Sequence, residues 1–232
     1  METSGEQPRR RGYGQYCAVA KALDVVGERW TLLIVRDLFL GPKRYTDLRT
    51  GLPGIATDLL TARLRTLERA GLVRRRTLPK PAPAMVYELT DRGRLLGPAL
   101  GALAQVGFGF LGEPADDTQM PPERLVLALR AAFDATAVPD HNATYQLQLE
   151  DEPFVIAVDG DGIDVAPGSA PHADLTLRTD PITLTRLLRR TTAPDDALRS
   201  GALQLEGTPG RLDHFLGAFA LGRRDPDRGP AR

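Results

Sequence analysis

The residues best suited to chemistry in this sequence are the arginines between positions 57 and 76. Leu60, Leu64 and Leu67 recur at helical spacing, which predicts an amphipathic helix over residues 57–70 with one apolar side toward a core. The opposite side has short side chains near its start and arginines farther on. Short side chains let a helix approach base edges, and arginine reaches guanine or phosphate. This side is therefore a candidate surface for reading DNA.

Three further arginines follow Gly71, the residue expected to end this helix. Strand alternation places Arg74 and Arg76 on one side and Arg75 on the other, so at most two of them can face DNA. The predicted contacts also include residues before the preceding short helix and at the tip of the following ribbon. The full predicted DNA-binding set is Lys43, Arg44, Thr57, Asp58, Thr61, Ala62, Arg63, Arg65, Arg69, Arg74, Arg76 and Lys80.

The charge of the chain divides into two halves. Residues 1–112 hold 18 Lys and Arg against 10 Asp and Glu, a net charge of +8. Residues 113–232 hold 12 against 20, a net charge of −8. A basic half suits a polyanionic partner, and an acidic half indicates a second module with other partners. The alternative is that these charges only solubilise a surface.

Several classes of protein are excluded by what the sequence lacks. The single cysteine, Cys17, cannot form an intrachain disulfide and suits a cytoplasmic protein. No run of about 18 apolar residues is present, and the N-terminal arginines precede no apolar signal segment, so we expect no membrane insertion. No HExxH, GxSxG or phosphate-loop pattern occurs, and the aspartates at 159–164 lack the later ligands of a calcium loop. The sequence therefore predicts no enzyme, no metal and no cofactor.

The elements that must position the arginines are predicted in a definite order. Helical patterns precede the 57–70 helix, and two alternating runs and a long apolar helix follow it, at residues 17–26, 28–40, 45–50, 72–78, 85–89 and 92–111. This is the order of a winged helix-turn-helix domain. In such a domain the second helix of the pair enters the major groove and the two-stranded ribbon flanks it.

The whole chain is predicted to be α+β. We expect a disordered arm, a winged helix-turn-helix domain, an acidic linker rich in Pro and Gly, an α+β domain and a disordered tail, at residues 1–12, 13–111, 112–122, 123–221 and 222–232. Short alternating strands among helices predict a small, mainly antiparallel sheet in the second domain. Its apolar residues either line a ligand cavity or fill a core. The candidate lining residues are Leu184, Leu187, Leu188, Leu203, Phe215, Leu216 and Phe219.

The first half resembles the HxlR-type family of bacterial winged-helix regulators over about residues 13–111. The matching residues are Cys17, Ala22-Leu23-Asp24, Gly27, Arg29-Trp30-Thr31, Tyr45-Thr46-Asp47-Leu48, Leu52-Pro53-Gly54-Ile55, Leu60-Thr61, Arg63-Leu64, Leu67-Glu68, Gly71-Leu72 and Tyr87-Glu88-Leu89-Thr90. The resemblance implies a homodimer on a near-palindromic operator of double-stranded DNA. It also implies that the first and last helices of the domain form the dimer interface.

This sequence departs from the family pattern at some positions, and the role of Cys17 has two alternative interpretations. Relatives often have a serine cap where Ala56 stands, so Thr57 is expected to cap the helix. Asp58 stands near a position that is often basic in relatives, and it could accept a hydrogen bond from cytosine. Cys17 lies where some relatives carry a redox-sensing thiol, and the alternative is a small buried residue. Trp30 is expected in the core.

The second half resembles the sterol carrier protein-like domain over about residues 120–221. The resemblance rests on DLTL at 174–177, on DP at 180–181 and on the SGxLxxEG pattern at 200–207. It implies a small sheet covered by helices around an apolar tunnel. We therefore expect a transcriptional regulator whose second domain binds a hydrophobic ligand or mediates contacts. The alternative is a carrier of hydrophobic molecules whose basic half binds an acidic partner or a membrane surface.

Overall fold

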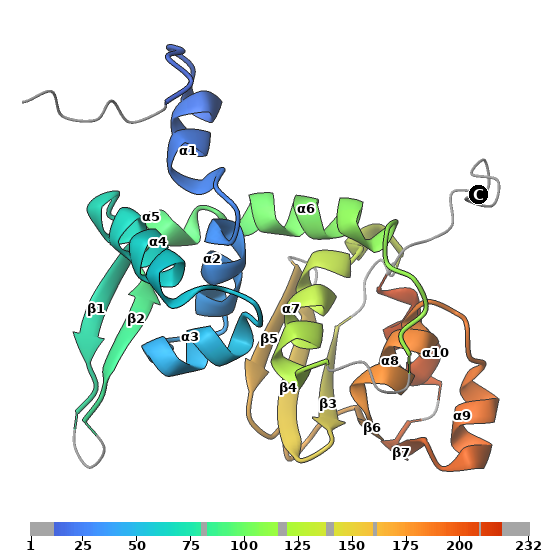
Figure 1. The fold of residues 1–232 in the computed structure, drawn as a ribbon. Coiled ribbons are helices and arrows are strands. Elements are labelled where there is room, and N and C mark those ends of the chain that lie inside the picture. The colour runs from blue at the N-terminus through green and yellow to red at the C-terminus, as the bar shows by residue number, and fades with distance from the viewer. Residues whose placement is uncertain are drawn as a thin grey trace, which may run out of the picture. The chain divides into compact units, whose positions relative to one another are not determined.

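The computed structural model describes residues 12–79, 83–115, 120–137, 142–159, 162–208 and 210–219. The chain divides into two compact units, Met1–Gly97 and Pro98–Arg232, which we call the first and the second unit. Figure 1 shows the helices and strands of both. Within the described residues, the helices are too short or too polar to cross a membrane.

The first unit has the predicted order of elements. Its helices and strands are α1 (Ala18–Val26), α2 (Thr31–Phe39), α3 (Tyr45–Gly51), α4 (Thr57–Arg69), β1 (Val73–Thr77), β2 (Met85–Leu89) and α5 (Asp91–Arg94). The helix-turn-helix pair is α3 and α4, and β1 and β2 form the wing. The sequence pattern therefore placed each element that surrounds the candidate interface.

The apolar side of α4 is buried as its spacing predicts. Leu60, Leu64 and Leu67 are at most 1% exposed, and they share the core of this unit with residues of α2 such as Ile34 and Leu38. Gly71 has a φ of 68°, a conformation that costs glycine little, and it ends the helix where expected. The buried leucines fix the rotation of α4 about its axis, and so fix which residues it exposes.

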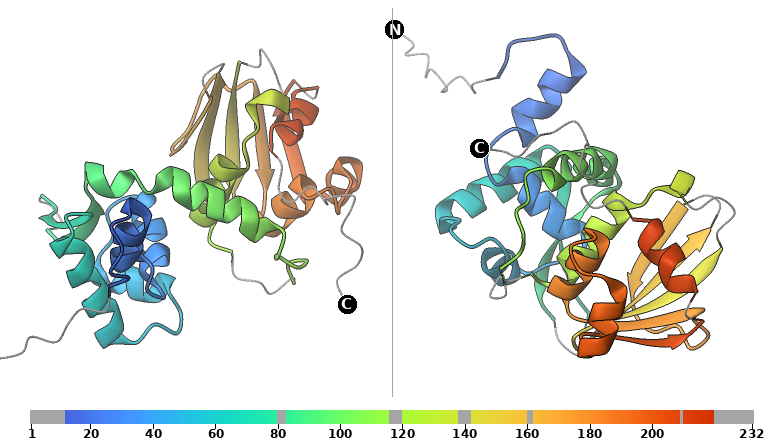
Figure 2. Two further views of the ribbon diagram at one scale, coloured as in Figure 1. Left: turned by 90° about the horizontal axis from the view of Figure 1, so that it is seen from above. Right: turned by 90° about the vertical axis from the view of Figure 1, so that its right-hand side faces the viewer.

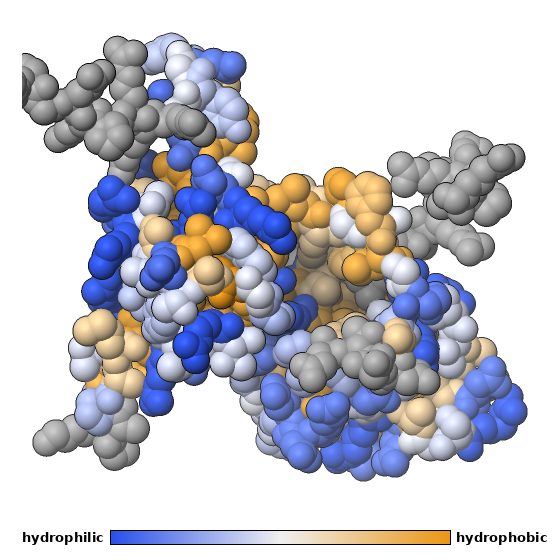
Figure 3. Space-filling view, in the orientation of Figure 1, coloured by the Kyte–Doolittle hydropathy of each residue, from blue (hydrophilic) through white to orange (hydrophobic). Residues whose placement is uncertain are grey.

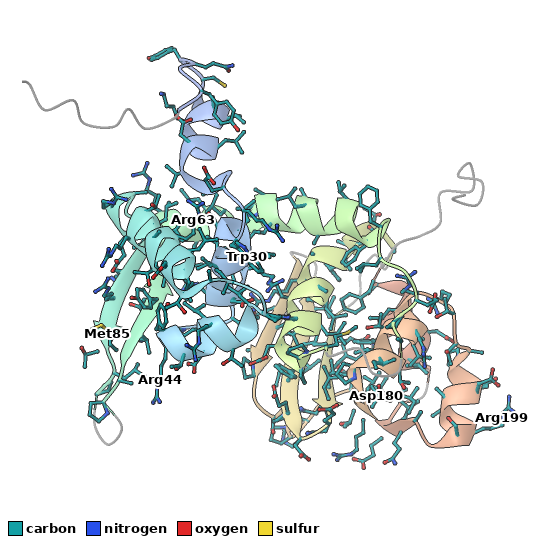
Figure 4. The ribbon with its side chains drawn as sticks, in the orientation of Figure 1. Trp30, Arg44, Arg63, Met85, Asp180 and Arg199 are labelled. Carbon is teal, nitrogen blue, oxygen red and sulfur yellow. The ribbon has the colours of Figure 1, made fainter. Side chains whose placement is uncertain are left out.

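Trp30 departs from its predicted place in the core. The side chain is only half-buried, its φ is 77°, and Arg29 lies over its ring with 5.4 Å between the guanidinium carbon and the ring centroid. The residue therefore forms the left-handed corner that opens α2, and its ring is partly covered by a cation. Its position just before α2 is labelled in Figure 4.

The wing is an antiparallel ribbon in which Arg74 pairs with Glu88 and Arg76 with Val86. A short bridge extends it, because the backbone N–H of Lys43 donates to Tyr87 O at 3.0 Å and the N–H of Tyr87 donates back to Lys43 O at 2.8 Å. Lys43, which stands just before the start of α3, is thereby attached to the wing. The helix-turn-helix pair and the wing are held together by backbone bonds as well as by packing.

The long helix predicted over residues 92–111 is two helices. α5 ends at Arg94, and α6 (Gly97–Phe108) begins after a two-residue turn. Thr90 caps α5 by accepting a hydrogen bond from the N–H of Gly93 at 3.1 Å, and it also donates to Gly71 O at 2.7 Å. The prediction of one continuous helix was wrong at Leu95 and Leu96, and Pro98 then lies in the first turn of α6, where a missing N–H costs no intrahelical hydrogen bond.

The second unit contains α6 and a five-stranded sheet with further helices. After α6 come α7 (Pro122–Ala132), a 3-10 turn (Ala135–Ala137), β3 (Ala143–Leu149), β4 (Glu152–Asp159), β5 (Gly162–Pro167), β6 (Leu175–Thr179), α8 (Pro181–Leu188), α9 (Pro194–Ser200), β7 (Leu203–Gly207) and α10 (Arg211–Gly217). The strand order is β5-β4-β3-β6-β7, and only the β3–β6 pairing is parallel among the described strands. The predicted α+β class with a mainly antiparallel sheet is confirmed.

Helices lie over one face of this sheet, as Figure 2 shows, and its strands bury apolar side chains in one core. Tyr145 and Leu147 alternate inward on β3 and are fully buried. Tyr145 packs edge-on against Phe215 of α10 with 5.0 Å between ring centroids, and Phe215 lies 5.0 Å from Phe219 in turn. Burial raises the pKa of Tyr145 to about 12. The core therefore continues from the sheet into α10 through a chain of aromatic rings.

The segment predicted as the start of a linker is fastened to α8. Arg186 donates to Pro114 O at 3.2 Å, and Arg189 donates to Leu111 O at 3.1 Å. Arg189 also lies 3.7 Å from the carboxylate of Glu113. Residues 111–115 are thus held within the second unit, and the division between the two compact units falls earlier, at Gly97.

Candidate nucleic-acid interface

The first turn of α4 is positioned by Tyr45 of α3. The Tyr45 hydroxyl donates to Thr57 O at 3.0 Å and lies 3.3 Å from the Thr61 hydroxyl oxygen. Asp47 accepts from the backbone N–H of Arg44 at 2.9 Å, which fixes the start of α3. Two side chains at one end of α3 therefore set the start of that helix and the start of the next.

The exposed side of α4 matches the predicted reading face. Thr57, Asp58, Ala62, Arg65 and Arg69 are exposed, whereas Thr61 and Arg63 are partly buried. Small or short side chains precede the two exposed arginines along this face. Figure 3 shows hydrophilic residues over this part of the first unit. The arrangement has the shape that close approach to base edges requires.

The arginines of α4 differ in whether their guanidinium groups are bound by other groups of the protein. Arg65 has no acidic partner in the described part of the chain. Arg69 folds back on its own helix, where it donates to Arg65 O at 3.2 Å and to the Thr66 hydroxyl at 3.3 Å. Arg63 donates to Glu28 at 2.8 Å, and its Nε atom is buried. Arg63 is therefore a support between α4 and the corner before α2, and Arg65 is the available cation.

Asp58 is exposed in the first turn of α4 and has no side-chain partner among the described residues. Ala56 occupies the N-cap position and no side chain caps the helix, so the predicted capping by Thr57 is absent. A carboxylate in the first turn interacts favourably with the positive end of the helix dipole. Asp58 thus supplies part of the stabilisation that a capping side chain would otherwise give.

The three arginines of β1 separate as strand alternation predicts, but all three are paired. Arg74 Nε donates to one oxygen of Glu88 at 2.7 Å, and Arg76 Nε donates to the other at 2.9 Å. On the opposite side, Arg75 Nε lies 2.7 Å from Glu68, and its guanidinium carbon lies 5.4 Å from the ring centroid of Tyr87. Two carboxylates therefore compensate most of the charge of the three arginines.

These ion pairs shift the ionisation of both signs of charge. The hydrogen bond from Arg74, followed by that from Arg76, holds the pKa of Glu88 below its ordinary value. The hydrogen bond to Glu68 raises the pKa of Arg75. Glu88 is only 8% exposed, so it is largely enclosed between β2 and its two arginines. The pairing of Glu28, Glu68 and Glu88 with arginines was not predicted from the sequence, although facing positions on the ribbon could have indicated the pairing of Glu88 with Arg74.

The other predicted contact residues lie around α3 and the wing tip. Arg44 is exposed at the start of α3 (Figure 4), whereas Lys43 is partly buried and bound to Tyr87 through its backbone. Lys80 lies outside the described residues. The structure therefore brings Arg44 and α4 into one helix-turn-helix pair and keeps Arg74 and Arg76 on the wing.

The candidate ligand residues of the second unit all lie in its core. Leu184, Leu187, Leu188, Leu203, Phe215, Leu216 and Phe219 are each at most 3% exposed and belong to one cluster of buried residues. The structure brings these residues together, as both a ligand cavity and a filled core would require. Their role as cavity lining stays a prediction.

Cys17 and the acidic residues form no further site in the described ranges. Cys17 is a free, exposed thiol just before α1, so the alternative of a small buried residue is wrong. No group of three His, Cys, Asp or Glu side chains that could hold a metal ion occurs between the described residues. The candidate chemistry of the chain is therefore concentrated in the basic residues of the first unit.

Comparisons with known proteins match the two halves separately. Residues 25–114 match the HxlR-like helix-turn-helix family model, and residues 126–219 match the SCP-2 sterol transfer family model. A helix-turn-helix transcriptional regulator of Synechocystis, sll1512, is 38% identical over 42% of this chain and 73% of its own. The regulator YvaP of Bacillus subtilis is 36% identical over 37% of this chain and 79% of its own.

Among solved structures, the sec-alkylsulfatase Pisa1 from Pseudomonas matches 43% of this chain and 16% of its own, with 22% identity and a TM-score of 0.41. That likeness is too low to assign an activity. The two regulators, by contrast, are more than a third identical to this chain over aligned lengths of 98 and 85 residues. The chain belongs to the HxlR-like helix-turn-helix family, and an SCP-2 domain follows the helix-turn-helix region in the sequence.

Proposed function

We propose that the protein is a transcriptional regulator that binds double-stranded DNA through α4 and the wing. The observation that carries this proposal is the exposed side of α4, where Ala62 and Arg65 stand opposite the buried leucines. Arg65 is exposed without an acidic partner in the described residues, so its donors are available to a guanine edge. Regulation of transcription would place the protein in the cytoplasm and requires no catalytic residue.

The residues of the interface divide by expected contact. Thr61, Ala62 and Arg65 face base edges, whereas Arg44 and Lys80 are assigned to phosphate. Arg63, Arg74 and Arg76 contribute mainly by support, because carboxylates of the same unit already bind their guanidinium groups. The proposed DNA-binding domain keeps its predicted extent, residues 13–111. It therefore includes α6, although α6 belongs to the second compact unit.

Salt-dependent binding to duplex DNA tests the proposal. A palindromic site selected from random sequences and a scrambled duplex of equal length are titrated with the full chain at several salt concentrations. A regulator gives a steep loss of affinity with salt, about 0.9 in logarithmic slope per phosphate contact, and prefers the selected site. Failure to select any site, with weak binding that is the same for both duplexes, would instead favour the hydrophobic carrier.

The proposal includes a homodimer on a near-palindromic operator. Exposed apolar residues support it, because Val19 of α1 is 67% exposed, and Leu103 and Val106 of α6 are 53% and 63% exposed. Figure 3 shows hydrophobic residues along α6. Sedimentation of Val106→Glu should show dissociation into monomers, with Leu198→Glu as the control, because Leu198 is an exposed apolar residue of the same unit on another helix, α9. Equal sedimentation of wild type and Val106→Glu would exclude this face of α6.

We also propose that the second unit binds a hydrophobic ligand between its sheet and α8 and α10. The SCP-2 match and the apolar composition of this core support the assignment. A fluorescent long-chain fatty acid serves as the probe. Saturable binding that Leu187→Trp abolishes, in a variant that still unfolds cooperatively, would support the site. Binding unchanged by Leu187→Trp would place the probe elsewhere.

A further inference from the structure

Helix α6, with twelve residues, is too short to be stable by itself. Three of its twelve residues are glycine (Gly97, Gly101 and Gly107), and none of its residues is buried. Glycine is the poorest helix former after proline, and a surface helix usually gains its stability by packing an apolar stripe. The helix must therefore obtain its stability from contacts made by other parts of the chain.

The contacts that hold α6 come from its own unit and lie on one side of it. Gln105 donates from its amide to Ala131 O at the end of α7, at 3.0 Å, and Phe108 packs against the core of the second unit. Just beyond the helix, Arg189 holds Leu111 O at 3.1 Å and Arg186 holds Pro114 O at 3.2 Å. These bonds fasten both the last turns of α6 and the chain that leaves it.

The opposite side of α6 carries exposed apolar residues. At 100° per residue, Gly101, Gln105 and Phe108 share one side of the helix, whereas Leu103 and Val106 point the other way. Leu103 and Val106 are more than half exposed. One side of α6 is therefore attached to the second unit, and the other remains available to a second copy of the chain.

We propose that α6 is a conditional helix, formed only while α7 and α8 hold it, so that the second unit controls the surface through which two chains associate. The dimer part of this inference rests on the proposed function, but the folding part does not. Arg186 and Arg189 lie on and just after α8, which also sends Leu184, Leu187 and Leu188 into the core. Any change of that core which shifts α8 also shifts the two arginines. They act as positioning residues between the core of the second unit and α6.

Amide hydrogen exchange of the full chain, without DNA, tests the proposal. In the variant Gln105→Ala with Arg189→Ala, amides 100–108 should exchange at least tenfold faster, while those of α4 stay unchanged. Arg190→Ala is the matched control, because Arg190 is exposed beside Arg189 and has no side-chain partner in the described residues. Equal exchange of α6 in the double variant and in wild type would overturn the proposal. Measurement at two protein concentrations separates protection by self-association from protection by the two anchors.

A compensating substitution supplies the converse test. Gly101 has no positive φ, and a Cβ at this position would meet nothing within 4 Å. Gly101→Ala should slow exchange of α6 about fivefold, or about 1 kcal/mol at 1.4 kcal/mol per tenfold, in both the wild type and the anchor variant. Failure of Gly101→Ala to slow exchange in the anchor variant would mean that α6 does not unfold there. A chain that binds no operator would leave these results intact and would disprove only the proposed function.

Discussion

Helix α4 and strand β1 are both rich in arginine, yet they use it differently. Arg65 of α4 is exposed and unopposed among the described residues, whereas Arg74, Arg75 and Arg76 of β1 are each bound to a glutamate of the same unit. The formal charge of the arginines is the same in both elements. The charge available to a binding partner differs, because a carboxylate at hydrogen-bond distance offsets most of the positive potential of the arginine that it binds.

The contrast explains how a wing with many arginines in its sequence can add only moderately to the affinity of the protein for DNA. Glu88 accepts hydrogen bonds from the Nε atoms of two arginines, which fixes both side chains against β2. Such a wing keeps its shape in the absence of DNA and adds limited counterion release on binding. Under the proposed function, sequence selection falls to Arg65 and the other exposed residues of α4.

The largest expected effect comes from removing the unpaired arginine. Arg65→Ala should weaken binding to the selected operator by about 1–3 kcal/mol and relax preference at one base pair. Arg74→Ala, the matched arginine that is already paired, should cost less and should weaken all sequences alike. Competition binding with single-base operator variants measures both. Equal losses from the two substitutions would remove the distinction between helix and wing.

The next effect comes from releasing the paired arginines. Glu88→Gln should destabilise the first unit by about 1 kcal/mol, since two hydrogen-bonded ion pairs lose their charge. The same variant should bind non-specific duplex more tightly, with a salt slope steeper by about 0.9 for each new phosphate contact. Denaturant unfolding and titrations against salt provide the two readouts. An unchanged salt slope would show that Arg74 and Arg76 do not approach DNA.

The contribution of Glu88 should also depend on pH. Its pKa is lowered in the folded protein, so its stabilisation is complete above the pKa of an unfolded glutamate, about 4.3, and is lost as pH falls through the lower folded value. The difference in unfolding free energy between wild type and Glu88→Gln should therefore be constant near neutral pH and disappear in acid. A difference that persisted at pH values below the folded pKa of Glu88 would require another cause.

The smallest effect belongs to Asp58, the acidic residue on a basic face. Asp58→Asn should cost α4 about 0.3–1 kcal/mol, because the first-turn carboxylate interacts with the helix dipole and no side chain caps the helix. Affinity for non-specific duplex should rise slightly as one repulsive charge is removed. If specificity is lost at a single cytosine, Asp58 reads a base, and its place on α4 then serves recognition as well as stability.

Local patterns in the sequence predicted most of the fold. Leucines at helical spacing fixed the rotation of α4, and strand alternation separated Arg75 from Arg74 and Arg76, because both depend on backbone geometry alone. The break between α5 and α6 was missed, although Gly97-Pro98 could have indicated it. The expected burial of Trp30 was wrong, because its left-handed corner depends on how the chain enters α2.

Contacts between distant residues could not be predicted from the sequence. The bond from Arg189 to Leu111 joins positions 78 residues apart, and that between Arg63 and Glu28 joins positions 35 apart. Neither residue type nor spacing distinguishes an arginine that will meet such a partner from one that will stay exposed. For the same reason, apolar periodicity placed Leu187 and Phe215 in one cluster without deciding whether that cluster encloses a ligand.

The partly covered ring before α2 gives the protein a built-in optical reporter. Trp30 is the sole tryptophan of the chain, and it stands in the first unit with one face against Arg29. Its emission can therefore follow the first unit alone, while far-ultraviolet dichroism follows the helices and strands of both units. Two spectra of one unlabelled sample can then show whether the units melt together or one after the other.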